Sequence, residues 1–340
     1  MQWTRLVVGS MTVITATLLS SCGDQPVQPD SQVVAVAEDV QFKVRGRTPD
    51  RTTGCTGCPE DGTFSDALDA VNVALEAEGA NIRVFMAEYL TTGQHDAMGQ
   101  VVFARDVGNK QLSSDFVPND PRRHAGTNVT YIVDGVDGGT SSGLLVADTE
   151  GAIDRAMATW GAETCSDLAM TKNSTTTFDI GVVQAIFGFG GIGAFIPFAD
   201  VIHAGWLPAG FFDVLAPGGS NFIVGVTFTI IFIDGNGPTD IDSNGKIDTA
   251  FGEIYYNDNF AWGIDVPGLA PIDVETVALH EAGHGLSQGH FGRFFGTIAN
   301  QKLHFAPEAV MNAAVFGTRQ TLLGSDIGGH CSNWAQWPNN

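Results

Sequence analysis

Apolar residues recur along the chain with helical spacing in some stretches and as alternating or continuous runs in others. Residues 66–78 place Leu68, Val71 and Leu75 on one face and are followed by Gly79, which predicts a helix that ends there. The pattern also predicts helices at about 148–169, 273–287 and 324–333, and strands at 82–90, 100–105, 129–133, 177–183, 225–234 and 252–257. Because helices and strands are mixed without strict alternation, we expect an α+β fold around a mixed twisted sheet.

Composition divides the chain into four segments. Residues 1–21 predict an export signal, because Arg5 precedes a mostly apolar stretch that is too short and too interrupted by Ser and Thr to span a membrane. Residues 22–60 show little hydrophobic periodicity and predict a tether. Residues 61–125 predict a small α/β segment, and residues 126–340 form the main domain.

Residues 19–22 (LSSC) resemble a bacterial lipobox, in which the chain is cleaved before Cys22 and lipid is attached to its sulfur. The alternative is an ordinary secretory signal with a Cys near its cleavage site. We favour the lipobox, because small residues precede Cys22 and a polar segment follows it. It predicts an exported protein that is lipid-anchored to the cell envelope (outer membrane or cell surface), faces the periplasm or exterior, and meets the membrane through its lipid alone.

The charge of the chain excludes some partners. The sequence has 340 residues, with 16 Lys and Arg against 38 Asp and Glu, and a formal net charge of -22. It contains no cluster of basic residues that could displace counterions from phosphates, so we expect no nucleic-acid partner. Hydrophobic residues make up 44% of the chain, which is enough for a sizeable core and argues against disorder.

Four cysteines remain besides Cys22, and they allow three pairings. Cys55 and Cys58 form a C-x-x-C pair, which could be a redox motif, half of a zinc site, a cap on a catalytic metal or a short structural disulfide. Export implies an oxidising compartment, and we favour the disulfides Cys55–Cys58 and Cys165–Cys331.

The strongest signal for function is residues 280–290 (HEAGHGLSQGH). On a helix, His280 and His284 are one turn apart on the same face, so both imidazoles can reach one metal ion. Glu281 lies beside the first ligand, and glycines after His284 let the chain turn back so that His290 supplies a third nitrogen. Three protein ligands leave the fourth position of a tetrahedral Zn2+ to water, as in catalytic sites. A chance match or buried core histidines are the alternatives.

This motif resembles the metzincin clan of zinc peptidases and its matrixin-like branch, whose pattern is H-E-x-x-H-x-x-G-x-x-H followed by a Met-containing turn. Residues 272–279 resemble the start of a matrixin active-site helix, and residues 309–312 (AVMN) resemble the Met-turn, which would place Met311 beneath the three histidines. Residues 323–327 resemble the start of the C-terminal helix, with Asp326 as a cap or a support of the Met-turn. The resemblance implies a metzincin-like zincin fold and makes residues 126–340 the catalytic domain.

Two features depart from the pattern of the clan. Ser287 stands where the clan has a glycine that usually adopts a left-handed conformation, which costs a non-glycine residue about 1 kcal/mol or somewhat more. The gap from His290 to Met311 is wider than in typical matrixins and predicts an inserted loop beside the cleft.

The resemblance implies a zinc-dependent endopeptidase that hydrolyses protein or peptide substrates through a zinc-activated water, with Glu281 as the general base. Two alternatives stay open: a non-catalytic surface binding protein on a metzincin scaffold, and a zinc hydrolase of non-peptide substrates. The intact Glu281 favours an enzyme over a decayed site. The sequence also leaves open which sheet edge would hold a substrate and whether residues 23–125 are a removable pro-segment.

Residues 240–248 (DIDSNGKID) predict a second cation site. Asp240, Asp242, Asn244 and Asp248 fall at positions 1, 3, 5 and 9 of an EF-hand loop, with glycine at position 6. Phe251 occupies position 12, where that loop has a bidentate glutamate. An acidic surface turn is the alternative, and we favour a structural Ca2+ because several oxygens recur at ligand spacing.

Residues 186–198 are apolar and rich in glycine, and they allow three roles. They could form core strands, a flap over the substrate or a loop that touches the membrane. We favour core packing, because apolar runs are usually buried.

Overall fold

The computed structural model describes residues 62–92, 111–123, 126–192, 198–268, 270–297 and 302–339. Several predictions lie outside these residues: the signal peptide, lipid attachment at Cys22, the tether, the Cys55–Cys58 disulfide and the strand at 100–105.

The main strands form one mixed sheet of eight strands, in which six follow one another in the order β1-β6-β8-β5-β3-β4. Their bounds in this order are Ile82–Thr91, Ile223–Asp234, Ile247–Asn257, Val201–Leu207, Asn128–Val133 and Ala169–Lys172. The four strands from β8 to β4 are parallel, whereas β6 runs antiparallel to β8, and β1 runs antiparallel to β6. β1 therefore joins the predicted N-terminal segment to the sheet of the main domain.

Short strands extend this sheet or form separate pairs. β2 (Ser114–Asp115) pairs in parallel with β8, and β7 (Gly237–Pro238) pairs with β6. Two small sheets follow, β9 (Trp262–Gly263) with β10 (Ile272–Asp273) and β11 (Arg293–Thr297) with β12 (Lys302–Ala306). The antiparallel pair β11–β12 lies in the interval where an inserted loop was predicted.

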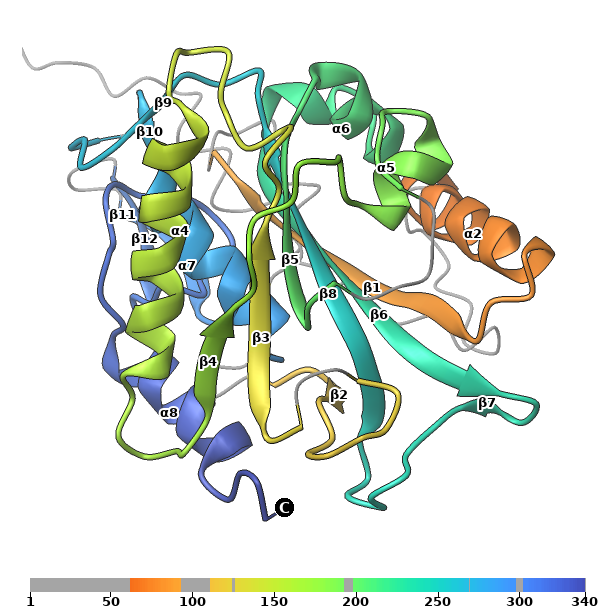
Figure 1. Cartoon of the computed structure of the whole chain (residues 1–340). Helices are drawn as coiled ribbons and strands as arrows, with labels where there is room; N and C mark the ends of the chain where they lie inside the picture. Colours follow the sequence, from red (N-terminus) through yellow and green to blue (C-terminus); the bar gives the residue numbers. More distant parts are fainter. Residues whose placement is uncertain are drawn as a thin grey trace, which may run out of the picture.

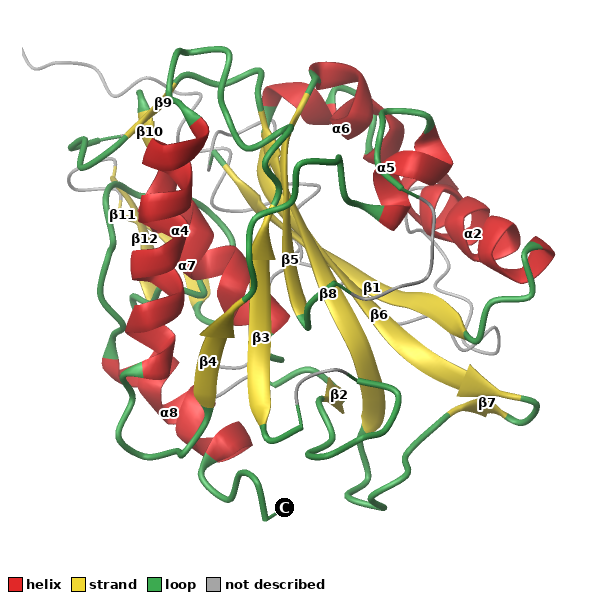
Figure 2. Cartoon of the chain, viewed as in Figure 1, coloured by secondary structure: helices red, strands yellow, loops and turns green. Residues whose placement is uncertain are grey.

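Helices cover both faces of the sheet (Figures 1 and 2). One face carries α4 (Val146–Gly161), α7 (Val274–Gly285) and α8 (Gly324–Trp334). The other face carries α2 (Gly62–Ala77), α5 (Val182–Phe187) and α6 (Ala209–Leu215), and a 3-10 turn, η1 (Gly219–Asn221), precedes β6. Successive strand residues point to opposite faces, so Tyr255 joins the core under α6, whereas its neighbours Ile254 and Tyr256 join the core under α7.

The structure confirms the mixed α+β class and corrects one predicted strand. No strand includes residues 177–183, because helix α5 begins at Val182. The cause is a tertiary contact: the buried carboxylate of Glu253 on β8 accepts hydrogen bonds from Val182 N (2.7 Å) and Val183 N (3.1 Å) at the start of the helix. The pattern of residues 177–183 contains no sign that Glu253, about 70 residues later, caps a helix there, so the pattern alone predicts a strand.

The apolar segment 186–198 packs in part against the core. Ile186 and Phe187 at the end of α5, and Phe198 after it, contact the cluster that lies beneath α2 and α6. Core packing is therefore confirmed for these residues, and residues 193–197 lie outside the described part of the chain.

A disulfide joins Cys165 after α4 to Cys331 on α8, with a Cα–Cα distance of 5.5 Å. This confirms the predicted pairing of these two cysteines and ties the last helix to the segment that follows α4. Among the residues that the structure describes, no helix is long and apolar enough to span a membrane.

Asp137, in the loop after β3, predicts a pH dependence of stability. Burial raises its pKa from 3.8 to about 6, and the charges of Asp179, Asp134 and Asp258 act in the same direction. Because the folded state holds this proton more tightly, the stabilisation it gives is complete below about pH 4 and is lost as the pH rises through about 6.

We therefore expect Asp137→Asn to raise the free energy of unfolding at pH 7 by about 1 kcal/mol. This value is smaller than the pKa shift alone implies, because solvent screens the charge of a partly exposed carboxylate. At pH 4 the substitution should change the free energy of unfolding little. Urea unfolding at both pH values measures this difference. The same substitution at the exposed Asp69 is the control. Equal stability of wild type and Asp137→Asn at pH 7 would refute the prediction.

Candidate metal centre

Helix α7 presents the first part of the motif. Asp273 caps the helix, because its side chain accepts a hydrogen bond from Thr276 N at 2.8 Å. Every residue of α7 is buried between the sheet and its neighbours, which fixes the rotation of the helix about its axis. His280 and His284 consequently lie one turn apart on the same side.

A tight reversal after α7 brings in the third histidine. Ser287 adopts the left-handed conformation with a φ of 63°, as expected for the position at which the clan has glycine. Its carbonyl accepts a hydrogen bond from Leu112 N at 2.9 Å, and Gln288 N donates to Gly283 O, also at 2.9 Å. These contacts hold the reversal, so Ser287 does not prevent His290 from turning back toward the helix.

The Nε2 atoms of the three histidines converge. The distances between them are 3.0 Å for His280–His284, 3.1 Å for His280–His290 and 3.1 Å for His284–His290. Tetrahedral zinc with Zn–N bonds of about 2.0–2.1 Å separates its nitrogen ligands by about 3.3–3.4 Å, so the observed triangle is close to the required size.

The opposite ring nitrogens fix which atoms face the centre. His280 Nδ1 lies 2.7 Å from Val310 O, and His284 Nδ1 lies 2.8 Å from Gln288 O. A carbonyl can only accept, so both Nδ1 atoms carry the proton, and the Nε2 lone pairs are directed at the centre. Nitrogen lone pairs that converge in a buried site fit a bound cation, and the donor set suits zinc.

Glu281 is completely buried beside this triangle. Its Oε2 accepts a hydrogen bond from Thr227 Oγ1 on β6 at 2.6 Å, while Oε1 has no hydrogen-bond partner among the described residues. Gly225 leaves the space that this carboxylate occupies, because a Cβ atom there would lie 2.8 Å from Oε1. Burial raises the pKa of Glu281 to about 7.

Met311 lies beneath the histidine helix. Its side chain is fully buried and lies so close to Gly283 that a Cβ atom there would overlap the sulfur. Asp326 of α8 supports this turn by accepting hydrogen bonds from Val310 N (2.9 Å) and Met311 N (3.1 Å). Asp326 also accepts from Leu323 N at the start of α8, so it combines the two roles considered for it.

Sequence reasoning missed Glu88 of β1. Its Oε2 lies 2.8 Å from His284 Nδ1. Burial alone would lower the pKa of His284, but the charges of Glu88 and Glu281 outweigh it and raise that pKa. The signal was present in the sequence, since Glu88 lies in an apolar run predicted to be a buried strand.

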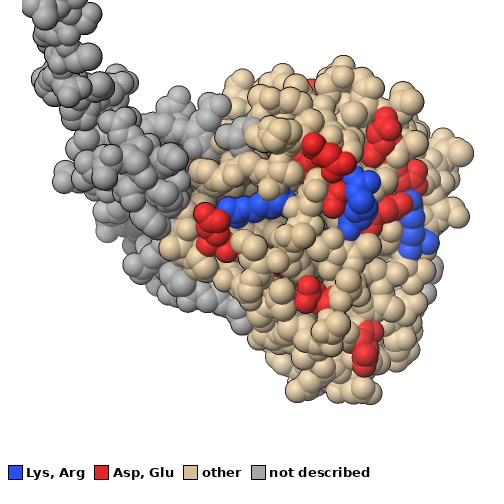
Figure 3. All heavy atoms as spheres, turned by 90° about the vertical axis from the view of Figure 1, so that its left-hand side faces the viewer, with Lys and Arg blue, Asp and Glu red and all other residues tan. Residues whose placement is uncertain are grey.

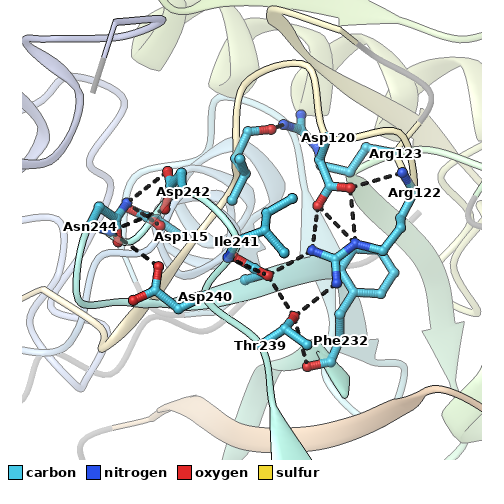
Figure 4. Close-up of polar contacts among 12 residues, drawn as sticks. Asp115, Asp120, Arg122, Arg123, Phe232, Thr239, Asp240, Ile241, Asp242 and Asn244 are labelled. Atoms are coloured by element: carbon cyan, nitrogen blue, oxygen red, sulfur yellow. Dashed lines mark hydrogen bonds and ion pairs between the residues drawn. The ribbon is translucent and has the colours of Figure 1, made fainter. Parts of the chain in front are cut away.

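The structure also brings together the residues of the predicted calcium loop (Figure 4). Carboxylate oxygens of Asp240, Asp242 and Asp248 lie within 4.8 Å of one another. Asn244 closes the loop, with its backbone N–H donating to Asp240 at 3.1 Å and its amide to Asp115 on β2 at 3.3 Å.

Basic residues already neutralise part of this loop. Arg122 lies 2.6 Å from the Asp248 carboxylate, and Lys246 lies 3.0 Å from Asp115. Thr239 also donates to Asp248 at 2.5 Å. Asp248 is therefore held by the protein itself, and Asp240 and Asp242 are the carboxylates that remain for a cation.

Calcium binding stays a prediction, and a thermal melt tests it. We expect millimolar calcium to raise the melting temperature of the wild type, since ligand at about 100 times Kd adds about 2.7 kcal/mol to folded-state stability. The double variant Asp240→Asn/Asp242→Asn should lose this increase, whereas Asp234→Asn, outside the three-carboxylate cluster, should keep it. The same wild-type melting temperature in calcium and in chelator would refute calcium binding.

Comparisons with known proteins place no family name on this site. No family model matches the chain, and no curated protein matches it. The case for its function therefore depends on the residues and their geometry.

Proposed function

We propose that the protein is a zinc-dependent endopeptidase. The observation that carries the proposal is the convergence of three histidine Nε2 atoms at 3.0–3.1 Å, next to the buried carboxylate of Glu281. Three nitrogen ligands leave a coordination position for water or substrate, and an adjacent carboxylate can move protons.

The arrangement of the chain supports a metzincin-like fold. A mixed sheet lies against α7, which carries the first two histidines, and the segment around Met311 lies beneath them. The last helix, α8, reaches this segment through Asp326. These are the parts that the sequence resemblance implies, and we assign the protein to this class as a proposal.

Zinc, Glu281 and Thr227 have different parts in the proposed hydrolysis. Zinc, when bound, supplies a Lewis acid that polarises a carbonyl and makes water a better nucleophile near neutral pH. Glu281 takes a proton from the attacking water and delivers it to the leaving amine. Thr227 restrains the Glu281 carboxylate through Oε2 and leaves Oε1 without a partner among the described residues, so Oε1 is the atom that can receive the proton.

We also propose the predicted setting of this activity. The protein is exported and held to the cell envelope by lipid on Cys22, and its macromolecular partner is a protein or peptide substrate. On the face drawn in Figure 3, Lys and Arg side chains do not gather into a basic patch. Mass spectrometry of the mature N-terminus, compared with Cys22→Ser, tests the anchor.

Zinc content and peptide cleavage together test the proposed activity. The three histidines and Glu281 are at most 2% exposed, so both the intact chain and the chain after limited proteolysis are assayed on denatured protein and a peptide library. Zinc at one equivalent with cleavage that chelator abolishes is the expected result. Zinc without any cleavage would instead support the binding protein, and turnover of esters alone would support the non-peptide hydrolase.

A further inference from the structure

Glu88 is a buried carboxylate within an otherwise largely apolar strand. It lies in β1, which pairs with β6 along most of its length, and its exposed fraction is 6%. Burying a carboxylate is unfavourable unless a positive charge or hydrogen bonds compensate it. In the part of the chain that the structure describes, Glu88 makes an ion pair with His284 and none with a lysine or arginine.

The register of the sheet places Glu88 at the metal centre. Glu88 is directly opposite Thr227 on β6, and paired residues on neighbouring strands point to the same face. Thr227 holds Glu281, while Glu88 lies 2.8 Å from His284 Nδ1. This pair of strand residues therefore contacts both the proposed general base and one proposed ligand.

The contact distinguishes His284 from His280. His280 Nδ1 has the neutral carbonyl of Val310 as its partner, at 2.7 Å. His284 Nδ1 donates its proton to the carbonyl of Gln288 at 2.8 Å, and in addition the carboxylate of Glu88 lies 2.8 Å from the same nitrogen as an ion-pair contact. The Gln288 carbonyl fixes the tautomer of His284, and a carboxylate next to the ring of a ligand histidine makes its other nitrogen a stronger donor to the metal.

The site also holds two carboxylates. Three neutral histidines leave both positive charges of a bound divalent cation uncompensated in a buried site. Glu88 and Glu281 are buried carboxylates next to that site. Buried charges are tolerated when they are paired in this way.

We propose that Glu88 is a positioning residue of the metal centre. Its carboxylate places a negative charge 2.8 Å from Nδ1 of His284, whose proton the Gln288 carbonyl accepts, and this charge makes Nε2 a stronger donor to the metal. The proposal rests on the proposed metal centre and assigns β1, from the N-terminal segment, a part in metal binding. In the sequence, the metal site consists of one helix and one turn. The pairing of β1 with β6 adds Glu88, which precedes His284 by 196 residues.

The test measures zinc affinity of the full chain by competition with a chromophoric chelator. Glu88→Leu should weaken zinc binding by about 10–100-fold. Glu88→Gln should weaken zinc binding to a similar extent, because glutamine keeps the shape of the side chain but removes the charge beside His284. Glu76→Gln, an exposed carboxylate on α2, is the matched control and should bind zinc as the wild type does.

A second readout separates positioning from general stability. In the cobalt(II)-substituted chain, the d–d absorption bands should shift in Glu88→Gln, since the donor strength of His284 changes. In a His284→Ala background, Glu88→Gln should cause no further loss of affinity. If Glu88→Leu fails to fold, Glu88→Gln alone still decides the matter through these two measurements.

The outcomes distinguish this inference from the proposed function. Zinc affinity and a cobalt spectrum unchanged in Glu88→Gln and Glu88→Leu would overturn the role of Glu88, even if the wild type cleaves peptides. Wild type that binds zinc with Glu88-dependent affinity but cleaves nothing would support the role of Glu88 and refute the peptidase. Wild type that binds no zinc would refute both.

Discussion

Replacing Glu281 with glutamine is expected to lower peptide cleavage by about 10²–10⁴-fold, the usual contribution of a general base. Glutamine keeps the shape of the side chain and can still accept the hydrogen bond from Thr227, but it cannot take a proton from water. Because Glu281 is not one of the three converging nitrogen donors, the zinc content should stay at the wild-type value. Single-turnover cleavage and metal analysis on the same preparations measure the two effects.

Glu275→Gln is the matched control for this prediction. Glu275 lies on the same helix and is also buried, but its carboxylate forms an ion pair with Arg155 at 2.5 Å rather than facing the histidines. We expect this variant to lose some stability and to retain cleavage. Cleavage by Glu281→Gln at the wild-type rate would show that another group acts as the base, and loss of zinc would show that Glu281 is a ligand or holds one in place.

Gly283→Ala is expected to lower the free energy of unfolding by about 1–3 kcal/mol, the range for overpacking a well-filled core. Glycine in a helix interior usually destabilises it, so alanine would ordinarily raise stability by roughly 0.5–1 kcal/mol. At this position, a Cβ atom would overlap Met311 Sδ and lie 2.9 Å from Trp160 Cζ2, and both side chains are fully buried. Urea unfolding of the wild type and of the variant shows whether the free energy of unfolding falls or rises.

Two further variants test whether the overlap with Met311 causes the expected loss of stability. Gly151→Ala, in helix α4, places its Cβ atom no closer than 3.8 Å to any atom outside its own turn and should raise stability. Met311→Ala should cost less in the Gly283→Ala background than in wild type, because removing the sulfur makes room for the new methyl group. Gly283→Ala with unchanged or higher stability would mean that Met311 does not pack against α7 as described.

The elements that the sequence predicted well carry their signal within a few residues. The helix expected at 66–78 is α2 (Gly62–Ala77), and the strand expected at 82–90 is β1 (Ile82–Thr91). The helix expected at 148–169 ends at Gly161, and strands β4 and β5 were not predicted. β4 has only four residues, and β5 follows an apolar glycine-rich stretch, so neither presented a clear alternating pattern.

The sequence by itself determined which three histidines come together, because helical spacing places His280 beside His284, and nearby glycines indicate a turn before His290. It likewise indicated Glu281, Met311 and the pairing of Cys165 with Cys331. Only the tertiary structure decided that Thr227 restrains Glu281, that Glu253 caps α5 and that Glu88 reaches His284. These contacts depend on strand register and on which face of the sheet each helix covers. Such contacts join residues far apart in the chain, so the local periodicity of the sequence cannot predict them.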